Sequence, residues 1–403
     1  MTYYKINAEK FFTTIAIISL IVMGIKLLSV FYATSRGVSL GYPYDSLVFE
    51  QFHRFTDWLI PIEFSKLSNP FDTSNELYKH LPPAPYGILT FWILSLSKLI
   101  KPMPLFFIIL FATLLINYLI FRKIIKCELR FINLIYFALL LSSYPLYFAI
   151  DRGNADIIAV LTISLFVFNI LNSFNLKIGI ILLTVLISLK PSWGLFVFCL
   201  IFFPINYIIL SILTIFLLYT FPIMYSGAGY DYLLILIKMA LPIIDNTNTF
   251  CHNFTCSLRV FNYNNQFSNF IIVILALAFN IFSLVKLKFF KPGYSVNLKI
   301  IISFFMALFT TLLINNPSPD YRLLILMPAI PLFIYIMDFY DLNLSRANYY
   351  LIILSYIFIF SFINISIVNF FPIHTFLRFS GVFLLFIIFN LILFRVSLDN
   401  SGK

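Results

Sequence analysis

The sequence predicts an all-α membrane protein, a polytopic transmembrane helical bundle of about twelve helices. Hydrophobic residues make up 61% of its 403 positions and charged residues only 11%, which is typical of proteins with many membrane spans. The apolar residues form long stretches, and the few charges fall mainly in the short gaps between them. No polar stretch is long enough for a soluble domain. We therefore expect residues 1–403 to form a single integral-membrane domain.

The expected spans follow each other along most of the chain. A transmembrane helix needs about 20 mainly apolar residues, and the first apolar stretch is too long for a signal-peptide core. We predict spans at residues 11–32, 104–121, 131–149, 155–173, 177–189, 193–204, 206–224, 269–286, 299–315, 322–337, 348–369 and 377–395. Two of them, 177–189 and 193–204, are short, and broken elements inside the bundle are an alternative for both.

Residues 84–100 leave two alternatives open. This stretch is apolar but short for a span, and it ends in Lys98 and Lys101. If it lies flat as a juxtamembrane helix, both termini are cytoplasmic; if it spans, every later loop changes sides. Cytoplasmic loops carry an excess of Lys and Arg. The flat alternative satisfies this rule better, because few later cations then lie outside: Arg152, Lys190, Lys238, Arg259, Arg322 and Arg378.

This threading gives two large extracytoplasmic loops, residues 33–103 with juxtamembrane helices, and residues 225–268. The second loop contains Cys251 and Cys256, and whether they form a disulfide is left open. A metal site there would need more ligands than the one histidine between them supplies, and we expect no metal and no cofactor. The net charge is +11 without a block of like charges, which indicates basic loops on a lipid bilayer and no nucleic acid.

Three polar turns face outward in the same threading, at residues 151–156, 190–193 and 315–322. A cation near hydrocarbon is costly without an anionic partner, and arginine matches the geometry of phosphate oxygens. Together, Arg152, Lys190 and Arg322 are therefore candidates to bind a lipid-linked phosphate. Structural alternatives remain for each: helix caps in the first turn, a lysine that reaches to the interface, and an ion pair between Arg322 and Asp320.

The first outer loop supplies the candidate acids. Asp57 lies between Phe55 and Trp58, and a partly apolar surrounding makes a carboxylate a better general base. A nearby Arg54 opposes that effect. The alternative is that Asp57 only pairs with Arg54 or caps a juxtamembrane helix.

The order of these motifs is informative. An acid in the first loop is followed by Asn69-Pro70-Phe71, a proline-rich helix start at residues 82–85, Arg152-Gly153-Asn154, Leu189-Lys190-Pro191 and Ser318-Pro319-Asp320-Tyr321. Over residues 10–340 this order resembles the GT-C superfamily of integral-membrane glycosyltransferases. It looks most like bacterial polyprenyl-phosphate-mannose-dependent alpha-mannosyltransferases.

The resemblance implies a hexosyltransferase on the extracytoplasmic face of the bacterial plasma (inner) membrane. One sugar, mannose or another hexose or pentose, passes with inversion from a polyprenyl-phosphate donor to a glycan or glycolipid acceptor. The family's general base maps best to Asp57, with Asp45 as the second choice. The donor phosphate would be bound by Arg152, Lys190 and Arg322. The residues expected to contact substrate are Arg54, His80, Asp151, Asn154, Trp193 and Tyr321.

Two other functions stay open. A lipid-linked polysaccharide polymerase or ligase would use the same membrane face, but it favours large outer loops with clustered arginines. A transporter or flippase of lipid-linked sugars favours repeated halves and helices broken near the bilayer midplane. The sequence shows no convincing internal repeat, and its polar residues lie at helix ends. We therefore favour the transferase.

Overall fold

The computed structural model describes residues 3–4, 7–37, 55–71, 75–80, 86–225, 295–314, 320–339, 344–361 and 373–399, and scattered helical positions between 274 and 287. Their regular secondary structure is helical, apart from one antiparallel pair of two-residue strands, β1 (Tyr3–Tyr4) and β2 (Leu344–Ser345). The prediction of an all-α fold is therefore confirmed for this part of the chain.

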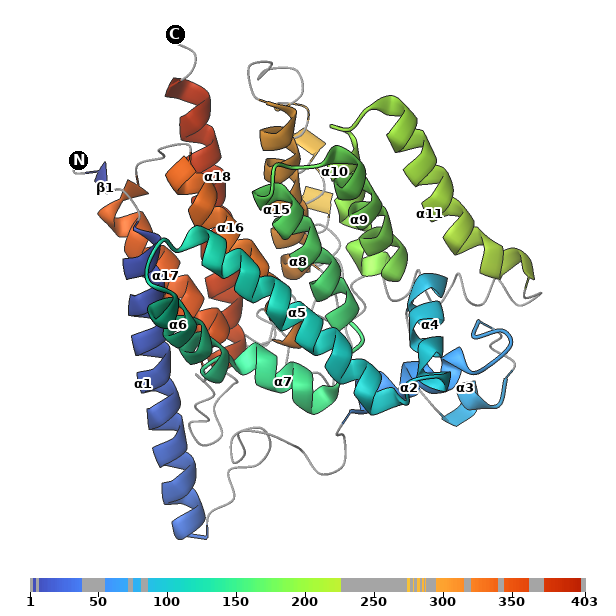
Figure 1. Cartoon of the computed structure of the whole chain (residues 1–403), viewed down its shortest axis with the longest axis horizontal. Helices are drawn as coiled ribbons and strands as arrows, with labels where there is room; N and C mark the ends of the chain where they lie inside the picture. The colour runs from blue at the N-terminus through green and yellow to red at the C-terminus, as the bar shows by residue number, and fades with distance from the viewer. Residues whose placement is uncertain are drawn as a thin grey trace.

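The first and last thirds of the chain meet along α1 (Ala8–Ser35). This helix begins at Asn7, whose side chain accepts a hydrogen bond from the backbone N–H of Lys10. It packs against α6 (Leu129–Leu141) and α17 (Arg346–Phe360), and β1 pairs with β2 at the same end. Figure 1 shows α1 running from the N-terminus down to the lower edge of the bundle.

The segment after α1 returns to the edge where α1 ends. It contains α2 (Thr56–Ser65), α3 (Leu77–His80), α4 (Ile88–Ser95) and the 3-10 turn η1 (Leu96–Lys98), before α5 (Pro102–Ile124). In Figure 1 these short helices lie toward the lower right, and α5 starts at the lower edge and rises. A helix of the length of α4 is about 12 Å long, too short to span a bilayer. The first predicted loop therefore contains short helices, and the apolar helix at Ile88–Lys98 is not long enough to cross a membrane on its own.

The predicted span at 131–149 is broken. It consists of α6 and α7 (Tyr144–Arg152), which are bent by 58° at the break. Pro145 lies in the first turn of α7, where it has no N–H to donate to the preceding turn and its ring would clash with it. The bend turns α7 across the lower end of the bundle (Figure 1).

The middle of the chain forms a run of shorter apolar helices. They are α8 (Ile157–Leu171), α9 (Leu176–Leu189), the 3-10 helix η2 (Pro191–Phe196), α10 (Val197–Leu200) and α11 (Ile205–Tyr225). The stretch at 193–204 is thus a 3-10 helix followed by a single turn of α-helix. This agrees with the broken-element alternative and excludes one regular spanning helix there.

The remaining described helices are α15 (Val296–Ile314), the 3-10 helix η3 (Asp320–Ile325), α16 (Leu326–Phe339) and α18 (Ile373–Asp399). The structure places α15 centrally, with 83% of its apolar window buried, whereas only 22% of the window of α1 is buried. Buried apolar side chains from α1 through α18 form one continuous core. The predicted loop at 225–268, with Cys251 and Cys256, lies outside the described residues except for Tyr225, the last residue of α11.

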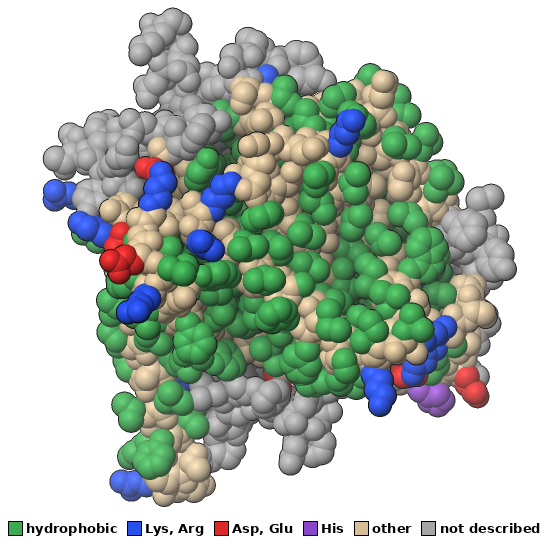
Figure 2. Space-filling view, viewed as in Figure 1, with side chains coloured by type: hydrophobic (Ala, Val, Ile, Leu, Met, Phe, Trp, Pro, Cys, Tyr) green, Lys and Arg blue, Asp and Glu red, His purple; other side chains and the backbone are tan. Residues whose placement is uncertain are grey.

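The prediction of about twelve spans is confirmed only in part. Among the described residues, three helices are long and apolar enough to cross a membrane: α1, α5 and α15, with the bent pair α6 and α7 as a fourth candidate. Large apolar side chains are exposed on α1, α5, α6, α9 and α11, including Leu28, Phe111, Leu134, Phe137, Ile181 and Leu210. Figure 2 shows hydrophobic side chains over the middle of one face, with Lys and Arg gathered at its left side and others near its upper right and lower edges.

Candidate functional site

The site begins with a tight turn between α7 and α8 at the lower end of the bundle. Gly153 ends α7 with a positive φ of 60°, a conformation that glycine adopts without steric cost. A Cβ on Gly153 would lie 2.4 Å from Cδ1 of Phe55. The backbone N–H of Phe55 donates to the carbonyl of Asp151 over 2.9 Å. The first loop is therefore docked directly onto this turn.

This docking brings Asp57 to Arg152, 95 residues further along the chain. The Nη2 atom of Arg152 lies 3.1 Å from Oδ1 of Asp57, and Nε lies 3.4 Å from Oδ2. The Nδ2 atom of Asn154 donates to the same Oδ2 over 3.4 Å. Both charged side chains keep 24% of their surface exposed. Asp57 thus forms a two-point ion pair that solvent and a ligand can reach.

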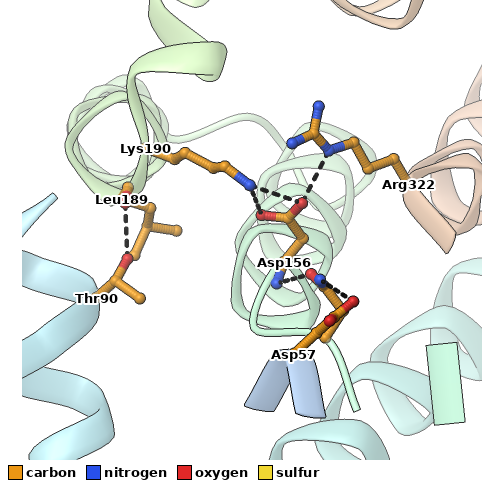
Figure 3. Close-up of polar contacts among 7 residues, drawn as sticks. Asp57, Thr90, Asp156, Leu189, Lys190 and Arg322 are labelled. Atoms are coloured by element: carbon orange, nitrogen blue, oxygen red, sulfur yellow. Dashed lines mark hydrogen bonds and ion pairs between the residues drawn. The ribbon is translucent and has the colours of Figure 1, made fainter. Parts of the chain in front are cut away.

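A second ion cluster lies deeper, around Asp156. The Nζ atom of Lys190 is 3.2 and 3.3 Å from the two carboxylate oxygens of Asp156, and Nε of Arg322 is 2.9 Å from one of them. The three side chains are only 4–7% exposed. Figure 3 shows the two cations reaching the carboxylate from opposite directions, with Asp57 close below.

The end of α9 holds Lys190 in place. The carbonyl of Leu189 accepts two hydrogen bonds from the start of α4, from the backbone N–H of Gly87 over 2.8 Å and from Oγ1 of Thr90 over 2.7 Å. A Cβ on Gly87 would lie 2.1 Å from the carbonyl oxygen of Ser188, so only glycine allows this approach. The ring of Tyr86 then lies 4.6 Å from Nζ of Lys190, within the range of a cation–π contact.

The charged groups of the buried cluster shift each other's pKa values. Burial alone raises the pKa of the Asp156 carboxyl, but the charges and hydrogen bonds of Lys190 and Arg322 outweigh it and hold the pKa below its ordinary value of 3.8. Burial, with the nearby charge of Arg322, lowers the pKa of Lys190 from 10.5 to about 8, although Asp156 and Asp57 oppose this. Asp156 is therefore ionised at neutral pH, and Lys190 is a cation that loses its proton in mildly basic solution.

Asn154 connects the two clusters. Its Nδ2 atom donates to Asp57, and its Oδ1 atom accepts the backbone N–H of Asp156 over 2.7 Å. The amide thus fixes the first residue of the deeper cluster relative to the acid of the exposed pair. The hydrogen bond from the N–H of Asp156 to Oδ1 of Asn154 also satisfies a backbone donor at the start of α8, as the cap interpretation of the turn predicts.

The structure gathers five of the residues singled out from the sequence, although they are far apart along the chain: Asp57, Arg152, Asn154, Lys190 and Arg322. The carboxylate of Asp57 pairs with Arg152, a partner that the structural alternative did not name, and Arg54 lies outside the described residues. Asp156 was missed as a site residue. The available signal was its position in the same turn as Arg152, opposite two cations that needed an anion.

Other predicted site residues lie elsewhere. Trp193 is 1% exposed and packs edge to face on Phe196, because η2 turns it into the core, which leaves it no surface for a substrate. His80 is exposed at the end of α3, and no described contact joins it to the two clusters. The side chain of Asp151 is buried, and its carbonyl receives Phe55. Tyr321 belongs to η3, but its side chain, like all of Asp45, falls outside the part of the chain described.

The arrangement offers a partly exposed carboxylate next to three cations, all at ends of apolar helices. Within the described ranges, no three His, Cys, Asp or Glu side chains are grouped as metal ligands would be. Comparison of the chain with family models, with curated proteins and with solved structures found no match. The interpretation of the site therefore depends on its own geometry.

Proposed function

We propose that this chain is a multi-pass membrane glycosyltransferase that uses a polyprenyl-phosphate sugar. The observation that carries the proposal is the pairing of one partly exposed carboxylate, Asp57, with a compact set of three cations at the ends of apolar helices. Inverting sugar transfer from a phosphate needs one base and a way to stabilise the leaving phosphate. The two clusters together provide both.

The proposed membrane position is supported by the three long apolar helices and by the broad exposed apolar surface, with the Lys and Arg side chains mainly at its margins. Exposed apolar surface on this scale is uncommon in soluble monomers. The site lies at the edge where α1 ends and α5 begins (Figure 1). In the threading that the basic residues favour, this edge is extracytoplasmic.

In the proposed reaction, Asp57 accepts the proton of an acceptor hydroxyl while that oxygen attacks the anomeric carbon of the donor. The bond between this carbon and the phosphate oxygen breaks, and the electron pair leaves with the polyprenyl phosphate. The anomeric configuration inverts. Asp57 then returns its proton to water. Arg152 and Asn154 hold the carboxylate in orientation before the transfer.

The cations have the complementary role. The leaving phosphate gains negative charge as the bond breaks, and the partly exposed Arg152 stabilises this charge together with the buried Lys190 and Arg322. Lys190 carries three N–H donors, and its described hydrogen bonds go to a single carboxylate. It therefore retains capacity to donate to a phosphate oxygen.

The placement of the charges favours transfer over transport. Asp156 precedes α8, Lys190 follows α9 and Arg322 lies in the turn before α16. Transporters typically place their substrate residues in broken helices near the bilayer midplane. Polar groups at helix ends suit a reaction at the membrane surface.

The test is Asp57→Asn in the purified full-length protein. Incubation with labelled polyprenyl-phosphate sugars and a crude lipid-glycan extract should give label transfer with the wild type and a loss of about 100-fold or more with the variant. The variant should still bind polyprenyl phosphate, because the buried cluster is untouched.

His80→Gln serves as a matched control, since His80 is exposed and outside both clusters. Wild-type turnover in Asp57→Asn would refute the assignment of the base. Loss of transfer only with Asp45→Asn would move the base to that residue. No transfer by the wild type with any labelled donor, together with no binding of polyprenyl phosphate, would remove the proposed function altogether.

A further inference from the structure

We propose, on the basis of the proposed function, that Asp156 is a positioning residue that holds Lys190 and Arg322 side by side as one cradle for the donor phosphate. Asp156 itself touches neither sugar nor acceptor in this proposal. It acts only through the two cations.

The first support is the convergence of three separate elements on one carboxylate. Asp156 stands at the start of α8, Lys190 at the end of α9, and Arg322 in η3 before α16. Without an anion between them, the ammonium and the guanidinium would repel each other across a poorly solvated space. The carboxylate, 2.9 to 3.3 Å from both, sets their spacing.

The second support is that this carboxylate has no local structural task. Asp156 is the N-cap residue of α8, yet its side chain makes no capping hydrogen bond. Other groups accept the nearby backbone N–H groups: the side chain of Asn154 accepts that of Asp156, and backbone carbonyls accept those of Ile157 and Ile158. An aspartate at a helix start ordinarily caps that helix, so its commitment to two distant cations indicates a different role.

The third support is the balance of charge. Asp156, Lys190 and Arg322 together carry one net positive charge at neutral pH, and a sugar phosphodiester carries one negative charge. Buried charges are tolerated when they are paired. The cradle therefore matches a monophosphate-linked donor in charge, and a diphosphate donor would bring a second negative charge.

The proposal has a consequence for pH. Four groups surround the ammonium of Lys190. They are the carboxylates of Asp156 (start of α8) and Asp57 (α2), the guanidinium of Arg322 (η3) and the ring of Tyr86, just before α4. With its pKa at about 8, Lys190 is a cation below that pH and neutral above it, so phosphate binding should weaken as the pH rises through this value. Asp156 favours the charged form of Lys190, and its removal should shift the weakening to lower pH.

The experiment measures the affinity of the detergent-solubilised full-length protein for undecaprenyl-phosphate mannose between about pH 7.5 and 9.5, a range in which its phosphodiester keeps one negative charge. We expect wild-type affinity to fall across this range and Lys190→Arg to abolish the fall, because arginine stays protonated. Asp156→Asn should weaken binding about tenfold at the lower pH, a difference equal to about 1.4 kcal/mol, and should start its decline earlier. The affinity of Asp156→Glu should lie between those of the wild type and Asp156→Asn.

Thr162→Val is the matched control, because Thr162 is buried on the same helix and donates only to the carbonyl of Ile158. It should leave affinity and pH profile unchanged. If Asp156→Asn does not fold, Asp156→Glu is used in its place, and its affinity should likewise begin to fall at a lower pH than that of the wild type. Unchanged or tighter binding in the Asp156 variants, with the wild-type pH profile, would overturn the positioning role while the proposed function stands. No binding by the wild type would count against the proposed function instead.

Discussion

The two ion clusters of the site use the same chemistry in different surroundings. Asp57 and Arg152 form a pair with 24% of each side chain exposed. Asp156, Lys190 and Arg322 form a triad in which no side chain is more than 7% exposed. A pair that water reaches contributes little to stability, since the medium screens it and competes for its donors. A buried cluster cannot lose one member without leaving a charge in a poorly solvated place.

The difference indicates a division of labour. The exposed pair is free to exchange partners, as a residue that accepts a proton from an incoming hydroxyl must do. The triad is buried and is held by three helices, so we expect its geometry to stay the same when a ligand binds. Asn154 joins the two regions, and the exposed acid is thereby fixed relative to the buried cations.

The largest expected effect is a difference in protein stability between variants of the two clusters. Asp156→Ala leaves two buried cations without their carboxylate and should lower the free energy of unfolding by about 3–5 kcal/mol. Asp57→Ala should lower it by under about 1 kcal/mol, because its pair is partly solvated. Thermal unfolding of the detergent-solubilised protein measures both. Equal losses would mean that the two clusters do not differ in the way their exposure indicates.

A smaller effect is expected at the turn that supports the exposed pair. Gly153→Ala introduces a Cβ at a positive φ and 2.4 Å from Phe55, and we expect a loss of about 1–3 kcal/mol. Transfer activity should fall with it, because Phe55 precedes the helix that carries Asp57.

Gly24→Ala is the control for this prediction, since nothing lies within 4 Å of a Cβ there and alanine favours a helix by up to about 1 kcal/mol. A Gly153→Ala protein with wild-type stability and activity would show that the contact between the turn and the first loop is not required.

The smallest effect concerns salt. In a double-mutant cycle, the coupling between Asp57 and Arg152 should be about 0.2–1 kcal/mol and should decrease at high ionic strength. The coupling between Asp156 and Arg322 should be larger and nearly independent of salt, because little solvent reaches it. Unfolding measured in low and high NaCl gives both values. A salt-independent coupling in the first pair would place Asp57 in a drier site than its exposure indicates.

Much of the helix order was predictable, because long apolar runs and the charges between them report helices and their ends. The same logic brought Asp57, Arg152, Lys190 and Arg322 to one end of the bundle. What the sequence could not show is which charge pairs with which. Arg54 is the nearer neighbour of Asp57 in sequence, whereas the contact that the structure describes comes from Arg152, 95 residues away.

Three further points depended on packing that the sequence does not determine. Asp156 has no motif of its own, and its role follows from two helices that bring cations to it. Trp193 follows a lysine of the site, yet η2 turns its ring into the core. Pro145 indicates a bend near α7, but a proline inside an apolar run can also occur in a kinked continuous helix. The sequence therefore does not show that the helix breaks there with a bend of 58°.

The small β1–β2 pair has a consequence for how the protein is made. Tyr3 pairs with Ser345 and Tyr4 with Leu344, and the adjoining α1 packs on α17. A ribosome finishes α1 long before either partner exists, at about 5–20 residues per second. More than three hundred further residues must therefore be synthesised after α1 before β2 and α17 can pack against the N-terminal segment.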